Sequence, residues 1–228
     1  MNKISKMSEV SWLLGIIFCS LGVALCTKAS FGLSMIAAAP YIIHIKMINF
    51  FPWYTQGTSE YIWQGILLVV MCIAVRRFKW RYLLSFAAAV IFGSAVDMWL
   101  RILGGNGAYV SLAARIAAFV LGELFTALAV AFYFRTYMPL QMYELVVVEI
   151  ADKYGFDKDK TKLANDIVML AVSVVFALSL NRSLEGLGIG TVVITLVNAA
   201  LIRFFGNLID RLFVFTPRFE KLQKIITA

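Results

Sequence analysis

The sequence predicts an all-α membrane protein with about six membrane-spanning helices and two short re-entrant or interfacial helices, arranged as two inverted repeats of three spans. The first observation is composition, because hydrophobic residues make up 61% of the 228 residues and charged residues only 15%. A soluble domain averages about 45–50% apolar and 25% charged residues. The second observation is a series of apolar runs long enough to span a membrane, and the third is the clustering of Lys and Arg between these runs.

Each span needs about 20 mostly apolar residues to cross roughly 30 Å of hydrocarbon. Lys3 and Lys6 precede the first run in the manner of a signal peptide, but no convincing small-residue cleavage site follows, so we expect a retained helix. The predicted spans fall near residues 9–28, 60–76, 82–103, 109–134, 163–181 and 187–213.

Two further apolar segments are too short to be comfortable spans. Leu33–Met47 is interrupted by Pro40, and Met138–Ala151 carries Glu144 and Glu149. Each has roughly 15 residues, which is typical of a re-entrant or interfacial helix. We therefore expect neither segment to cross the membrane.

The distribution of Lys and Arg predicts the orientation. If only the six longer runs cross and the N-terminus is cytoplasmic, Arg76–Arg81, Lys153–Lys162 and the basic tail 214–228 all face the cytoplasm. If the short segments crossed as well, Arg76–Arg81 would face outward, against the positive-inside rule. We therefore expect both termini to be cytoplasmic and the protein to lie in a bacterial inner membrane.

The two halves of this single membrane domain, residues 9–103 and 109–213, share one order of elements. Each has a span, a short helix, a polar loop and two further spans. Phe31–Met35 (FGLSM) and Thr136–Leu140 (TYMPL) occupy the same place in the two halves. Three spans in each half mean that the second half enters from the opposite side, so the repeats are inverted, as in many secondary transporters.

Three short motifs carry a family resemblance: Ala29–Ser34 (ASFGLS) after the first span, Met138–Gln141 (MPLQ) after the fourth, and Gly188–Thr191 (GIGT) at the start of the last. With these motifs the sequence resembles the YczE/YyaS/YitT group of bacterial membrane proteins, a family of largely unknown function. The resemblance implies a multi-pass membrane protein of this size. Met35–Ala37 stands here in place of a Pro-Trp-Asp-like triplet, and Gln141 in place of an acid.

Ionisable and polar side chains inside spans are costly to bury and are therefore candidates for function. Glu123 lies near the middle of its span, and it is either a proton- or cation-coupling group or half of a buried ion pair with Arg115. Asp97 forms an i, i+4 pair with Arg101, whose simplest role is to anchor that helix end. Asn198 serves either as an interhelical hydrogen bond or as a ligand contact.

The short helices suggest a binding site. Ser34 precedes or opens the first, and Pro139 suits the first turn of the second. If their N-termini point toward the midplane, their N–H groups form a site for an anionic group. Gln141 and Glu144 would then share one face toward that cavity. Alternatively, both helices lie flat at the membrane interface.

These features predict a permease that moves a small solute or ion by alternating access around a midplane site at the repeat interface. The alternative is a non-transporting accessory, regulatory or substrate-capture subunit, acting with a partner subunit or as a homo-oligomer. Gly188, Gly190 and Thr191 lack the lysine and third glycine of a nucleotide loop, so we expect them to serve close helix packing.

We expect no enzymatic activity, cofactor or metal site. His44 is the single histidine, and no nucleophile or metal-ligand motif accompanies it. The net charge of +8 arises from short basic clusters between apolar runs, which indicates contact with the lipid bilayer rather than with nucleic acid.

Overall fold

The computed structural model describes residues 4–105, 107–219, 223 and 226. Within these residues the chain forms eight α-helices, one π-helical turn and two short strands. In chain order the elements are β1 Ile4–Met7, α1 Ser8–Ala29, α2 Met35–Met47, α3 Gln56–Val75, α4 Arg81–Ile102, α5 Leu112–Tyr133, α6 Met142–Tyr154, α7 Lys158–Phe176, the π-helical turn η1 Ala177–Asn181, α8 Ile189–Leu212 and β2 Phe213–Thr216.

In the described part of the chain, six helices are long and apolar enough to cross a membrane: α1, α3, α4, α5, α7 together with η1, and α8. This confirms the predicted membrane-like, multi-pass architecture. Two of these helices begin a full turn or more before the predicted boundary, α3 at Gln56 and α7 at Lys158. Their preceding residues explain this: the Thr55 side chain accepts a hydrogen bond from the Thr58 backbone N–H, and that of Asp157 accepts one from Lys160.

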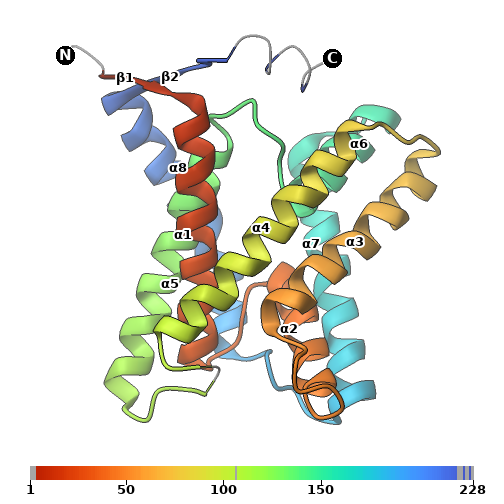
Figure 1. Ribbon diagram of the computed structural model, residues 1–228, viewed down its shortest axis with the longest axis vertical. Coiled ribbons are helices and arrows are strands. Elements are labelled where there is room, and N and C mark those ends of the chain that lie inside the picture. Colours follow the sequence, from red (N-terminus) through yellow and green to blue (C-terminus); the bar gives the residue numbers. More distant parts are fainter. Residues whose placement is uncertain (1–3, 106, 220–222, 224–225, 227–228) are drawn as a thin grey trace.

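The short helices α2 and α6 both begin inside the bundle. After α1 reaches the end opposite the chain termini, the chain returns toward half height before α2 starts (Figure 1). After α5, the segment 134–141 likewise descends from the other end before α6 starts. The first turns of both helices thus lie deep within the molecule.

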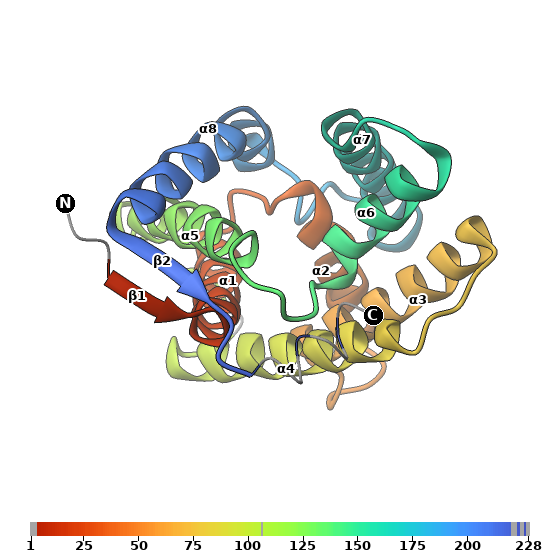
Figure 2. The ribbon, with the colours of Figure 1, turned by 90° about the horizontal axis from the view of Figure 1, so that it is seen from above.

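The helices pack in pairs that correspond between the two halves. α1 packs along α5, α4 packs on α1, and α8 packs on α5. In the same way α2 contacts α3 and α7, while α6 contacts α7 and α3. The last pairs differ, because α3 and α4 pack along each other whereas α7 and α8 stand apart (Figure 2).

Two glycines allow α1 and α5 to pack closely. A Cβ atom on Gly22 would lie 2.7 Å from the Gly122 carbonyl oxygen, and a Cβ on Gly122 would lie 2.9 Å from that of Gly22. Small residues at membrane helix contacts permit such backbone approach. The contact between α1 and α5 is the most extensive one between two helices in the described part of the chain.

Two short strands accompany the helices of this all-α architecture. β1 and β2 pair in parallel, with Ile4 opposite Phe213 and Met7 opposite Thr216. The predicted basic tail 214–228 therefore begins within a strand, and its residues Lys221 and Lys224 lie outside the described residues. Four-residue strands are too short to give a clear alternating pattern in the sequence.

Candidate functional site

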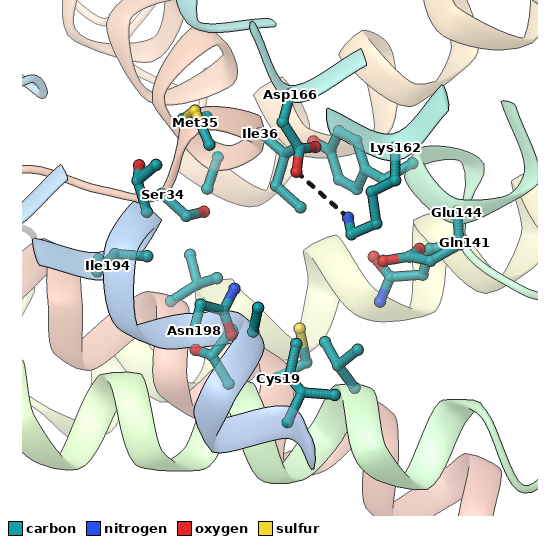
Figure 3. Close-up of a pocket in the computed structure, with 18 of the residues that line it drawn as sticks. Cys19, Ser34, Met35, Ile36, Gln141, Glu144, Lys162, Asp166, Ile194 and Asn198 are labelled. Carbon is teal, nitrogen blue, oxygen red and sulfur yellow. Dashed lines mark ion pairs between the residues drawn. The ribbon is translucent and has the colours of Figure 1, made fainter. Parts of the chain in front are cut away.

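A cavity of about 140 Å³ lies where the first turns of α2 and α6 meet (Figure 3). All eight α-helices contribute residues to its wall. Ionisable and polar side chains line it within otherwise apolar helices, which is the expected signature of a functional site in a membrane protein. These residues are Ser34, Glu60, Thr126, Gln141, Tyr143, Glu144, Lys162, Asp166, Thr195 and Asn198.

Ser34 stands at the N-cap position of α2 and lines the cavity. Its side chain makes no capping hydrogen bond, and its carbonyl accepts the N–H groups of Ala37 at 3.0 Å and Ala38 at 2.9 Å. Met35 and Ile36 follow it along the same wall. The start of α2 therefore lies at the cavity, and the Ser34 side chain is not used to cap the helix.

Gln141 occupies the corresponding N-cap position of α6. Its Nε2 donates to the Tyr133 hydroxyl at 2.7 Å, and its carbonyl accepts the Glu144 N–H at 3.2 Å. The N–H of Met142 donates to Gln64 Oε1 on α3 at 3.1 Å. Gln141 and Glu144 both line the cavity, and α3 already occupies part of this helix terminus.

Pro139 does not lie in the first turn of α6, which corrects the prediction. The helix begins at Met142, and the Pro139 carbonyl accepts a hydrogen bond from Trp12 Nε1 at 3.0 Å. Ser34 and Gln141 are the N-cap residues of the two short helices, whereas the alignment made on sequence alone placed Ser34 opposite Pro139.

Glu60 is a buried cavity residue that sequence reasoning missed. It is fully buried, and its Oε2 accepts a hydrogen bond from the Tyr143 hydroxyl at 2.9 Å. Gln56, Glu60 and Gln64 are all fully buried at i, i+4 spacing on α3. This polar stripe along one face of an apolar helix was the available signal.

Lys162 and Asp166 form an ion pair in the cavity wall, with Nζ and Oδ2 3.6 Å apart (Figure 3). Both belong to α7, where their i, i+4 spacing places them on one face. The pair was not predicted as a site because it lies near the start of the span. Among the described residues that line the cavity, Lys162 is the sole basic side chain.

Glu123 is buried with 6% exposure, but it is not among the residues that line the cavity. The predicted partner is wrong, because Arg115 Nε donates to the Ala29 carbonyl at 2.8 Å and its Nη2 to that of Ser30 at 2.9 Å. Arg115 lies beside the C-terminal end of α1, where free carbonyl groups accept hydrogen bonds from a cation.

Asp97 also has a different role from the predicted pair with Arg101. Its Oδ1 accepts the Gly57 N–H at 2.7 Å, and its Oδ2 accepts the Thr55 hydroxyl at 2.5 Å. Arg101 is exposed. Asp97 thus caps the start of α3, because Gly57 and Gly93 let the backbones of α3 and α4 approach closely.

Gly188 and Gly190 lie against the segment before α2. The Gly190 N–H donates to the Phe31 carbonyl at 2.8 Å, and the Leu33 N–H donates to the Gly186 carbonyl at 3.0 Å. A Cβ on Gly188 would lie 2.5 Å from the Phe31 carbonyl oxygen. We call this the 31–33/186–190 contact.

Thr191 belongs to the same region of α8. A Cβ on Gly32 would lie 2.5 Å from the Thr191 hydroxyl oxygen. Residues of the 31–33/186–190 contact also line a separate cavity of about 300 Å³, together with Thr27 and Tyr41. Residues of the contact thus line this second cavity, and the nearby residues Ser34 and Ile194 line the central cavity.

A second charged cluster joins α6 to the start of α4. Glu149 accepts hydrogen bonds from Lys79 Nζ at 2.8 and 2.7 Å and from the Tyr82 hydroxyl at 2.7 Å, with Arg81 Nη2 at 3.3 Å. Burial raises the pKa of Glu149, but the hydrogen bonds and positive charges outweigh burial, so the pKa lies below its ordinary value.

The family described as "Family of unknown function (DUF6198)" matches residues 7–207 of the chain. The chain is also similar to the "Uncharacterized protein YyaS" of Bacillus subtilis (strain 168). The two are 24% identical over 204 residues, which cover 88% of this chain and 93% of the relative. This similarity confirms the resemblance to YyaS-like proteins. No solved structure matches.

Proposed function

We propose that this chain, which belongs to the DUF6198 family of unknown function, is a membrane permease for a small solute or ion, with its substrate site in the central cavity. The observation that carries this proposal is the meeting of the first turns of α2 and α6 at a cavity lined by ionisable side chains. Broken or short helices that end near the midplane form substrate sites in many transporters. Irregular backbone at that depth is tolerated where protein or a cavity covers it.

An inverted repeat is part of the proposal. It is supported by the matched packing of the two halves, in which α4 on α1 corresponds to α8 on α5, and α2 on α7 corresponds to α6 on α3. It is also supported by direction, because α1 and α5 start at opposite ends of the bundle (Figure 1). The separated α7 and α8 would make one half looser than the other.

Alternating access requires a closure on each side of the site. We propose that the 31–33/186–190 contact closes the central cavity toward the second cavity. The Glu149 cluster would hold α6 to the α3–α4 hairpin toward the other end. Opening one closure while the other persists would then expose the site to each side in turn.

We propose that both termini face the cytoplasm of a bacterial inner membrane. The loop containing Arg76–Lys79 and the loop before α7 lie at the end that carries the chain termini (Figure 1). In a variant without native cysteines, an impermeant thiol reagent added to intact cells should label Trp53→Cys and spare Lys158→Cys. Both positions are exposed, so labelling reports orientation. Labelling of Lys158→Cys alone would reverse the topology.

Transport is tested by reconstituting the purified chain in liposomes and measuring uptake of small ammonium, carboxylate and neutral solutes. A permease gives saturable uptake of at least one class, and Glu60→Gln should reduce it because Glu60 lines the cavity. If no class is transported and the chain copurifies with a stoichiometric partner, the accessory or substrate-capture alternative is favoured.

A further inference from the structure

We infer that the central cavity binds a small organic ammonium ion that carries an alkyl group. This inference rests on the proposed permease function, and it names the substrate class of the same site. It depends on which hydrogen-bonding groups in the cavity lack partners, on the balance of charge, and on the apolar part of the wall.

The groups without partners are acceptors. Glu60 Oε1, Glu144 Oε2 and Asn198 Oδ1 are buried oxygen atoms that, among the described residues, have no hydrogen-bond partner. They come from α3, α6 and α8, and all three residues line the cavity. An acceptor left unpaired in an apolar environment is costly. A ligand with several N–H donors would satisfy them together.

The charge of the wall favours a cation. Three carboxyl groups line the cavity, those of Glu60, Glu144 and Asp166, against the single ammonium group of Lys162. Asp166 already pairs with Lys162. A bound ammonium group would supply a counter-charge for the remaining carboxyl groups, which buried charges inside a membrane require.

The remaining wall is apolar. Val23, Phe92 and Ile194 are apolar residues of the cavity wall, and the cavity volume is about 140 Å³. Ligand sites of this kind combine an apolar wall with a few polar groups that fix orientation. An alkyl group on the ammonium nitrogen would use this surface, whereas a bare inorganic cation would not.

The starts of the short helices argue less strongly for the anion expected from the sequence. The first-turn N–H of Met142 in α6 already donates to Gln64, and the first-turn N–H of Ala37 in α2 donates to the Ser34 carbonyl. Two of the first-turn donors that an anion would need are therefore used by the protein itself.

The test compares four probes that differ in charge and in donors: n-butylammonium, tetramethylammonium, n-butyrate and sodium. Binding to the purified full-length chain in detergent is measured at pH 7 by calorimetry and by thermal shift, because a ligand of the folded state stabilises it. We expect n-butylammonium to bind and stabilise, and the other three to do so at least tenfold more weakly. Equal or tighter binding of tetramethylammonium, n-butyrate or sodium would overturn the inference.

Three variants test the site. Glu60→Gln and Glu144→Gln should each weaken n-butylammonium binding by tenfold or more, which is about 1.4 kcal/mol. Glu123→Gln is the matched control, because Glu123 is a buried carboxyl group outside the cavity wall, and its binding should stay within twofold. Size-exclusion profiles show whether each variant is folded. If both cavity variants fold and bind as tightly as the parent, the inference fails.

Flux separates this inference from the permease proposal. If n-butylammonium binds with the expected variant pattern but is not taken up into liposomes, the binding site stands and its transport role is contradicted. If a carboxylate or neutral solute is taken up and n-butylammonium does not bind, the permease stands and the ammonium class is wrong.

Discussion

The hydroxyl of Tyr143 on α6 donates a hydrogen bond to Glu60 Oε2 on α3 at 2.9 Å, and both side chains are buried. Tyr143→Phe would leave a buried carboxyl group without its donor. Such a loss costs about 1–3 kcal/mol. We therefore expect a lower free energy of unfolding, measured by denaturant titration in detergent. Tyr61→Phe is the control, since its hydroxyl makes only a longer hydrogen bond to Thr58 at 3.3 Å, and an equal loss there would contradict the assignment.

The Glu149 cluster predicts a dependence of stability on acid. The folded-state pKa of Glu149 lies below its ordinary value of 4.5. A carboxyl group with a lowered folded-state pKa contributes stability above its unfolded pKa, and this contribution disappears as the pH falls through the folded value. Between about pH 5 and pH 3, the melting temperature should therefore fall more steeply for the parent than for Glu149→Gln.

The same variant has a cost at neutral pH. Glu149→Gln removes the hydrogen bonds that Lys79 and Tyr82 donate to a charged carboxylate. A hydrogen bond to a charged group contributes about 1.5–3 kcal/mol to stability. Asp152→Asn is the control, because its ion pair with Lys158 is largely exposed and contributes about 0–1 kcal/mol. Parallel pH profiles for the parent and Glu149→Gln would show that this cluster does not titrate as described.

Asp97→Ala should destabilise the start of α3. The variant loses the acceptor for the Gly57 N–H and the Thr55 hydroxyl, and losing a helix cap costs about 0.5–2 kcal/mol. Arg101→Gln should change the free energy of unfolding by less than about 0.5 kcal/mol, as exposed substitutions usually do. A comparable loss of unfolding free energy in Arg101→Gln would support the Asp97–Arg101 ion pair predicted from the sequence.

Glu123→Gln should leave the free energy of unfolding unchanged or raise it. The change replaces a buried carboxyl group whose Oε1 has, within the described residues, no hydrogen-bond partner. Arg115→Met should lower the free energy of unfolding independently, because the carbonyl groups of Ala29 and Ser30 lose the hydrogen bonds that Arg115 donates. The effects of the two changes should add within about 0.5 kcal/mol in the double variant. Rescue of Glu123→Gln by Arg115→Met would show that they are partners after all.

The apolar runs predicted the spanning helices and both short helices, because length and hydropathy are local properties of the chain. Pairing of side chains between helices is not local. Asp97 and Arg101 are suitably spaced on one helix, but the Asp97 carboxylate accepts a hydrogen bond from the backbone N–H of Gly57 on another helix. Arg115 likewise finds carbonyl groups at the end of α1 rather than Glu123.

The cavity was predicted in part. Ser34, Gln141, Glu144 and Asn198 all line it, since their positions follow from where the short helices and the last span begin. Glu60 was missed because it was the first residue of the span predicted from the sequence, residues 60–76. α3 begins earlier, at Gln56, so Glu60 lies a full turn inside the helix.

The pairing of β1 with β2 joins the two ends of the chain, Ile4–Met7 with Phe213–Thr216. Contacts between residues so distant in sequence form late, because the intervening chain must first be ordered. During synthesis β1 therefore has to wait until α8 has been inserted before its partner strand exists. Fusions that displace either end would remove this last step of assembly while leaving the helices in place. Limited proteolysis near β1, compared between nascent and completed chains, would follow this step.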